Sequence, residues 1–229
     1  PPEVLHPVNL AKPEPGENEI LIHIKSTAVN SGDWRVRKAE PFMVRLFFGL
    51  FRPKKQILGS VLSGVVEETG SKTSHFKPGD EVFGLTEIRM GTYAEYISLP
   101  DDMPLAPKPY NLTHEEAAAI PFGAHTALHF LRKAGIENIS GSGKIKILIY
   151  GDSGAVGTSA VQLAKHFDTE VTGVCSTANV EMVKALGADR VIDYIKENPL
   201  MDTTKYDIIV ETVNKAPSSG LIKMLKENG

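Results

Sequence analysis

The sequence predicts an α/β protein in two parts, an antiparallel β domain followed by a parallel sheet with helices on both faces. In the first half, short runs of alternating apolar and polar residues are separated by turns. After about residue 110, strand patterns alternate with helix patterns, which is typical of a doubly wound parallel sheet. We therefore expect one domain at 1–110 and a second at 111–229.

Four segments of the first half carry the alternation of a half-buried strand. They are 19–29, 61–67, 81–84 and 92–99. The turn Pro78-Gly79-Asp80 separates two of them. No long helical pattern interrupts this half, so the expected domain is mostly antiparallel β.

The second half begins with helices and then alternates. Thr113 and Glu116 have the spacing of a capping box, and Pro121 predicts a break before a second helix that ends near Lys133. Strands are expected at 144–150, 170–175, 190–193 and 206–211, with helices at 154–167, 180–186 and 218–226. A complete sheet of this kind has about six strands, so we expect it to continue beyond Gly229. We also expect the true start of the protein to precede Pro1.

The composition is that of a soluble globular protein, with 41% apolar and 23% charged residues. The net charge of −3 gives no electrostatic reason to expect a nucleic acid or an anionic membrane as partner. No apolar run approaches the roughly 20 residues of a membrane span. The single cysteine, Cys175, forbids an intrachain disulfide and fits a reducing compartment, so we expect a cytoplasmic protein. A basic, aromatic cluster at 45–55 is expected to pack its apolar side on the body, with a membrane-touching helix as the alternative.

A glycine-rich turn joins the 144–150 strand to the helix that follows. Its spacing is G-x-x-G-x-x-G, where the usual dinucleotide fingerprint is G-x-G-x-x-G. Glycines let the backbone approach a pyrophosphate closely, and the helix N-terminus offers N–H groups to its charge. The turn therefore predicts a dinucleotide site, with a plain strand–helix turn as the alternative. The expected contacts are Gly151, Ser153, Gly154, Ala155, Val156 and Gly157.

The end of the next strand favours NADPH as the cofactor. An NAD site places Asp or Glu about 20 residues beyond the glycine turn, to bind the ribose 2′-hydroxyl. The segment 174–179 contains no acid. Ser176, Thr177 and Asn179 can donate hydrogen bonds to a 2′-phosphate, although no Arg or Lys stands beside them.

Short motifs along the chain resemble one family. They are 29–33 (VNSGD), 57–60 (ILGS), 63–66 (SGVV), 78–84 (PGDEVFG), 91–96 (GTYAEY), 126–127 (TA), 187–189 (GAD) and 193–194 (DY). In this order they resemble the medium-chain dehydrogenase/reductase superfamily, in its zinc-free, zeta-crystallin-like quinone-oxidoreductase branch. The resemblance implies a GroES-like β domain, a Rossmann domain whose sheet is incomplete here, and a cleft between them for nicotinamide and substrate.

The resemblance also implies that no metal is bound. The zinc enzymes of the superfamily hold their metal with Cys and His in tetrahedral array. Asn30 stands at the position of the first catalytic Cys, and Ser60-Val61 at that of a His-Glu pair. One cysteine cannot form a four-cysteine structural site. His125 and His129 have helical i, i+4 spacing, but histidines on a helix surface are the default interpretation.

The implied activity is hydride transfer from NADPH to a quinone or to an α,β-unsaturated carbonyl compound. Asn30 and Thr126 are the expected catalytic residues. Asn30 would bind the acceptor oxygen or order the ribose side of the cleft, and Thr126 would position the nicotinamide. The alternatives are an Asn that fixes a turn and a hydroxyl bonded to its own helix.

Three further residues are expected near the cofactor, because this fold binds ligands at the carboxyl ends of its strands. They are Tyr194, Val213 and Asn214. Other functions stay open: an enoyl-thioester reductase, a non-catalytic NADPH-binding protein, or an inactive fragment. No general acid is evident. The expected partner is a small quinone or enone, with no nucleic acid and no membrane, and the resemblance implies a homodimer.

Overall fold

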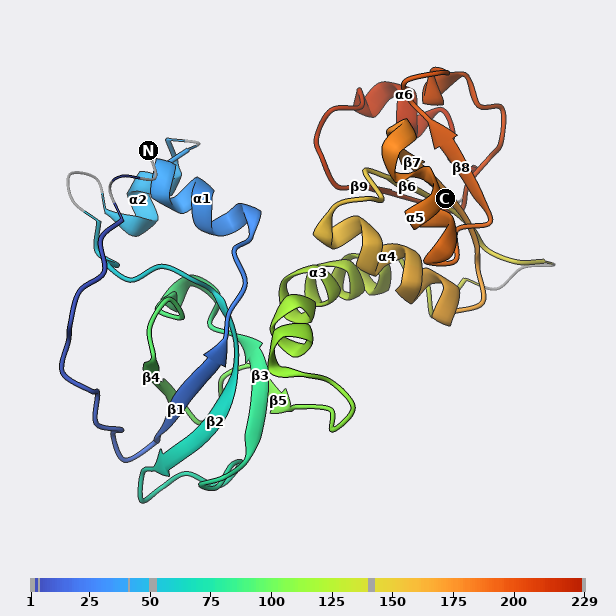
Figure 1. The fold of residues 1–229 in the computed structure, drawn as a ribbon. Helices are drawn as coiled ribbons and strands as arrows, with labels where there is room; N and C mark the ends of the chain where they lie inside the picture. Colours follow the sequence, from blue (N-terminus) through green and yellow to red (C-terminus); the bar gives the residue numbers. More distant parts are fainter. Residues whose placement is uncertain (1–2, 4, 41, 50–52, 140–142, 228–229) are drawn as a thin grey trace. The chain divides into compact units, whose positions relative to one another are not determined.

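The computed structural model describes residues 3, 5–40, 42–49, 53–139 and 143–227. The chain forms two compact units, Pro1–Phe122 and Gly123–Gly229, and each is described by itself (Figure 1). Among the described residues, no helix is long and apolar enough to cross a membrane.

The first unit is built on a five-stranded antiparallel sheet in the order β4-β1-β2-β3-β5. Its strands are β1 (Glu19–Ser26), β2 (Val61–Thr69), β3 (Glu81–Leu85), β4 (Tyr96–Pro100) and β5 (Leu105–Pro107). On one face of β1, Ile20 and Ile22 pack in a core with Leu62 and Val82, and Leu21 on the other face is buried as well. The four strands predicted for this half are confirmed, although β4 starts later than expected and β5 was not predicted.

Two short helices lie between β1 and β2 in the sequence, α1 (Ser31–Lys38) and α2 (Val44–Phe48). Helix α1 was not predicted, because its start depends on a side-chain cap and not on apolar periodicity. Within α2, Leu46 is 52% exposed, so the expected packing of the 45–55 apolar side is wrong for this side chain. Residues 50–52 of that cluster lie outside the described residues.

Helix α3 runs unbroken from His114 to Lys133 with Pro121 inside it, so the predicted break is wrong. The capping box is confirmed: Thr113 N donates to Glu116 Oε2 (2.9 Å) and Glu116 N donates to Thr113 Oγ1 (3.2 Å). Proline in a helix interior costs about 3 kcal/mol. Tertiary packing offsets that cost, since α3 buries Ala117, Ala118, Ala127 and Leu131 completely or nearly so.

The second unit contains a four-stranded sheet in the order β8-β7-β6-β9, and every described pair is parallel. Its strands are β6 (Lys146–Tyr150), β7 (Glu170–Cys175), β8 (Arg190–Asp193) and β9 (Ile208–Glu211), and its main helices are α4 (Ala155–His166), α5 (Val180–Ala185) and α6 (Ser218–Ile222). The predicted strands and their alternation with helices are confirmed. This order is that of one half of a doubly wound dinucleotide fold, with the reversal of strand order between β6 and β9.

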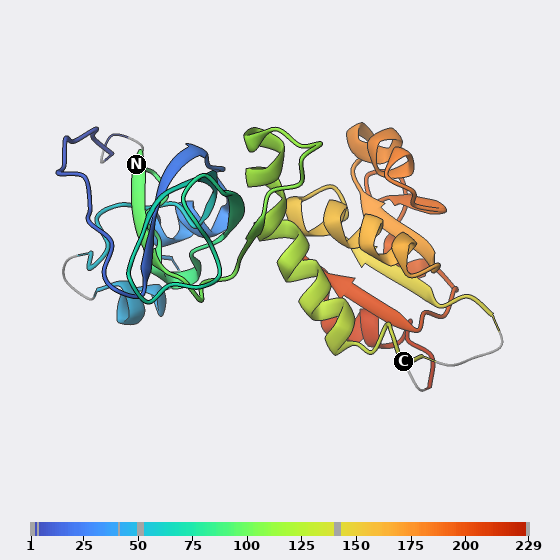
Figure 2. The same cartoon turned by 90° about the horizontal axis from the view of Figure 1, so that it is seen from below.

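Helices cover both faces of this sheet (Figures 1 and 2). On β6, Ile147 and Ile149 pack in one core with Val161 of α4, while Leu148 packs in another with Leu221 of α6. This alternation explains why β6 reads as a continuous apolar run: both of its faces are buried.

Candidate dinucleotide site

The glycine turn between β6 and α4 is tight because two of its glycines have no room for a side chain. Gly151 has φ +85°, and a Cβ on it would lie 2.5 Å from Thr212 Oγ1. A Cβ on Gly157 would lie 2.2 Å from the Gly151 carbonyl oxygen. At Gly154 the nearest atom to a Cβ is 3.6 Å away, so this glycine is not required by the protein's own packing. The first and third glycines of the motif therefore build the turn.

Helix α4 begins at this turn with its first N–H groups available. Gly154 is the N-cap residue, and no side chain caps the helix. Ala155, Val156 and Gly157 stand in the first turn, where N–H groups have no acceptor four residues earlier in the helix. The helix dipole adds partial positive charge there. This is the arrangement that binds phosphate groups in dinucleotide folds.

The carboxyl end of β9 is tied to the same turn. Thr212 Oγ1 lies 3.0 Å from the carbonyl oxygens of both Tyr150 and Gly151. The Glu211 carboxylate accepts hydrogen bonds from the backbone N–H of Asn214 (2.7 Å) and of Val213 (3.3 Å), which turns the chain away from the strand. The structure thus places the predicted Val213 beside Gly151, and Asn214 follows it in the turn that Glu211 holds. Thr212 was not among the predicted contacts.

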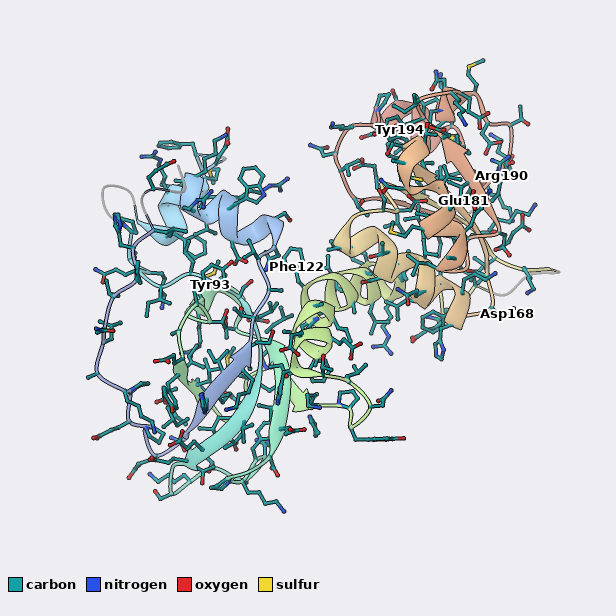
Figure 3. All side chains as sticks on the ribbon, viewed as in Figure 1. Tyr93, Phe122, Asp168, Glu181, Arg190 and Tyr194 are labelled. Atoms are coloured by element: carbon teal, nitrogen blue, oxygen red, sulfur yellow. The ribbon has the colours of Figure 1, made fainter. Side chains whose placement is uncertain are left out.

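The ends of β7 and β8 form a second polar cluster. Asn179 Nδ2 donates to Ser176 Oγ (3.2 Å), and Thr177 Oγ1 donates to Asp193 Oδ2 (2.6 Å). The hydroxyl of Thr177 is the main cause that holds the pKa of Asp193 below its usual range, so Asp193 is a charged acid. Tyr194 follows it, 49% exposed (Figure 3). Ser153 is half-buried on the glycine turn.

Asp193 was not among the predicted site residues, because it lies 16 positions from Thr177 in the sequence. Asp193 lies outside the segment 174–179, where an NAD site would place its acid. The carboxyl ends of neighbouring parallel strands meet at one edge of the sheet. An acid at the end of the next predicted strand, such as Asp193, could therefore have been expected beside Thr177.

A carboxyl group is buried directly under the glycine turn. Asp152 is fully buried, and neither of its carboxyl oxygens has a hydrogen-bond partner of ordinary geometry among the described residues. Burial raises the pKa of Asp152 to about 6. The Cys175 thiol, a weak donor, lies beside it, and burial together with Asp152 raises the pKa of Cys175 to about 12. The thiol is therefore neutral.

An open cavity of about 460 Å³ adjoins the site within the second unit. It is lined by Thr126, Phe130, Lys133, Ala134, Val156, the four residues of β9 and Thr212. The cavity brings the predicted Thr126 together with Val156 of the glycine turn and with Thr212. The cavity runs along β9, the edge strand of the described sheet, on the side of α3.

Asn30 holds a polar network in the first unit. Its Oδ1 accepts from the N–H groups of Gly32 (2.8 Å) and Asp33 (3.2 Å), which caps α1, and its Nδ2 donates to Ser60 Oγ (2.9 Å). Asp33, 2% exposed, accepts from Ser60 Oγ (3.2 Å) and from Tyr93 OH (3.0 Å). Burial raises the pKa of Tyr93 far above its usual value. The turn-fixing role of Asn30 is thus visible; its catalytic role stays a prediction.

No group of three or more His, Cys, Asp or Glu side chains is arranged to hold a metal ion within the part of the chain that the structure describes.

An antiparallel β unit followed by a parallel sheet with a glycine turn at its switch point defines a dinucleotide-binding oxidoreductase fold. The family model of the alcohol dehydrogenase GroES-like domain matches residues 16–110, and that of zinc-binding dehydrogenases matches 155–229. The chain belongs to the medium-chain dehydrogenase/reductase superfamily, in its quinone-oxidoreductase branch. The predicted family and fold class are confirmed.

Three similar proteins place the chain in that branch. It is 35% identical over 230 residues to a 2-methylene-furan-3-one reductase of Solanum lycopersicum, covering 96% of this chain and 56% of that protein. It is 35% identical over 233 residues to a chloroplast envelope quinone oxidoreductase homolog of Arabidopsis thaliana, covering 98% and 68%. The structure of Escherichia coli quinone oxidoreductase complexed with NADPH matches with a TM-score of 0.81 at 26% identity, covering 100% and 68%. The chain thus spans between about half and two-thirds of the length of these relatives.

Proposed function

We propose that this protein is an NADPH-dependent, zinc-independent oxidoreductase that passes a hydride to a quinone or an α,β-unsaturated carbonyl compound. The observation that carries the proposal is the uncapped start of α4 at a turn that only glycine permits at Gly151 and Gly157. The names of the similar proteins, a furanone reductase and quinone oxidoreductases, support the substrate class.

The residues present fit a nicotinamide dinucleotide. Its diphosphate would be held by the N–H groups of Ala155, Val156 and Gly157, and its nicotinamide would extend toward the cavity lined by Thr126 and Thr212. When bound, the cofactor supplies the hydride. The protein's part is to orient the cofactor and to shelter the reacting atoms.

The preference for NADPH rests on the loop after β7. Asn179 donates to Ser176 Oγ, which leaves the proton of that hydroxyl for a 2′-phosphate oxygen. Thr177 is occupied by Asp193. The similarity to a structure that contains NADPH supports the same choice.

Ser176→Ala is expected to weaken NADPH binding by about tenfold, the effect of losing one hydrogen bond to a charged group. NADH has no 2′-phosphate, so its dissociation constant should change less than about twofold. Calorimetric titration with both cofactors measures the two constants. Ser218→Ala, which removes a serine hydroxyl at the start of α6, is the control. Equal losses of affinity for NADH and NADPH would show that Ser176 does not bind the 2′-phosphate.

Zinc independence is supported by the network around Asn30 and Ser60. The amide and hydroxyl bond to each other and to Asp33, and these uncharged groups replace the soft or imidazole ligands that zinc requires. Tyr93 OH donates to Asp33, so it is not placed as a proton donor. The proton that completes the reduction would then come from water, which suits a quinone or an enone.

Steady-state oxidation of NADPH by the full-length protein tests the proposal. We expect turnover with 1,4-benzoquinone or an enone such as methyl vinyl ketone, unchanged after dialysis against a zinc chelator. A clear preference for a crotonyl thioester would favour the enoyl-thioester reductase instead. Binding of NADPH without turnover of any acceptor would favour the non-catalytic alternative, and loss of activity on chelation would contradict zinc independence.

A further inference from the structure

The carboxyl of Asp152 has only weak partners among the described residues, the Cys175 thiol and its own backbone N–H. It occupies the second position of the glycine turn and is fully buried, and neither oxygen has a hydrogen-bond partner of ordinary geometry among the described residues. A buried polar group without a partner costs stability. Packing alone therefore does not explain why a carboxyl group is buried at this position.

The surrounding backbone is shaped to hold this carboxyl. A Cβ on Gly173 of β7 would lie 1.8 Å from Asp152 Oδ2, and a Cβ on Gly157 would lie 2.5 Å from Asp152 Cα. Glycine at 173 leaves the space that the carboxyl occupies, and glycine at 157 lets the start of α4 approach the backbone of Asp152. The side chain therefore lies between the phosphate-binding turn above and β7 beneath.

No neighbouring charge fixes the ionisation of Asp152. From β7 it meets the neutral Cys175 thiol, and α5 contributes the apolar Val183, which lies beside Gly173. Two other acids stand at the carboxyl ends of neighbouring strands: Asp193 ends β8, and its charge acts on Cys175, while Glu211 ends β9, and its charge acts on Tyr150. No described Lys, Arg or His contributes to its pKa, which burial places at about 6. The group thus passes between neutral and charged forms near physiological pH.

We propose that Asp152 sets the affinity of this site for its dinucleotide, because its neutral form accepts the diphosphate and its charged form repels it. The inference rests on the proposed function. The diphosphate carries negative charge and would lie on the N-terminus of α4. That helix begins at Ala155, shortly after Asp152 in the same turn. A charge in a poorly solvated position acts strongly at such short range. By reciprocity, a bound dinucleotide favours protonation of Asp152.

Calorimetric titration of the full-length protein with NADP⁺ and NAD⁺ at pH 5.5, 6.5 and 7.5 tests the proposal. NAD⁺ has no 2′-phosphate, whose own titration would otherwise mix with that of Asp152. We expect the dissociation constant of the natural protein to rise about tenfold between pH 5.5 and 7.5. Asp152→Asn should bind at pH 7.5 as tightly as the natural protein binds at pH 5.5, with a nearly flat pH profile. Glu181→Gln, which removes an exposed acid from α5, is the matched control and should keep the natural slope.

A second measurement uses the natural protein alone, so it does not require that a variant folds. Titration at pH 6.5 in buffers of different ionisation enthalpy counts the protons taken up on binding, and NAD⁺ should bring uptake of a fraction of a proton. Parallel pH profiles for the natural protein and Asp152→Asn, or no proton uptake, would overturn the inference while leaving the binding site intact. Absence of binding by every protein at every pH would instead overturn the proposed function.

Discussion

Gly157→Ala is expected to weaken dinucleotide binding by at least about 100-fold. The new Cβ would lie 2.2 Å from the Gly151 carbonyl oxygen, a backbone atom that cannot move without opening the turn. Overpacking of this kind costs about 1–3 kcal/mol. Opening the turn also displaces the N–H groups that would bind the diphosphate, and each such bond to a charged group is worth about 1.5–3 kcal/mol.

The comparison variant is Gly154→Ala, in the same turn. Its Cβ would have no protein atom closer than 3.6 Å, so its thermal unfolding should match that of the natural protein while Gly157→Ala unfolds earlier. Titration with NADPH and a thermal unfolding curve for each variant measure both effects. A Gly157→Ala protein that binds NADPH with natural affinity would show that this turn does not hold the diphosphate.

Replacing the buried acid is expected to have the largest effect on stability. Burial raises the pKa of Asp152 from 3.8 to about 6. An acid with a raised pKa in the folded state stabilises the fold fully below its unfolded pKa and loses that contribution as the pH rises through its folded pKa. The loss should therefore occur between about pH 4 and pH 6 and amount to about 3 kcal/mol.

Asp152→Asn cannot ionise, so its stability relative to the natural protein should rise by about 3 kcal/mol from pH 4 to pH 7. In a chain of this length that corresponds to roughly 6–12 °C in the midpoint of thermal unfolding. Scanning calorimetry at pH 4, 5, 6 and 7 measures the difference. The exposed Glu181→Gln should show no such trend. A difference between Asp152→Asn and the natural protein that is constant with pH would mean that the buried carboxyl keeps an ordinary pKa in the fold.

The sequence was sufficient for features that depend on local patterns. Alternating apolar residues identified β1, a continuous apolar run identified β6, and the glycine spacing identified a tight turn between β6 and α4; its role as a phosphate site stays a prediction. It was insufficient where contacts between residues that are distant in the sequence determine the local structure. Pro121 stays in α3 because buried alanines and Leu131 hold the helix together, which a local rule does not see. From the sequence alone, Asp152 resembles an ordinary, exposed loop acid. Its burial depends on the space that Gly173 leaves on another strand, β7.

The central claim is tested most directly by a crystal structure of the full-length protein with NADPH. We predict that the diphosphate oxygens accept hydrogen bonds, at about 2.9 Å, from the N–H groups of Ala155, Val156 and Gly157 at the start of α4. A diphosphate bound elsewhere, with these N–H groups left to water, would contradict the account.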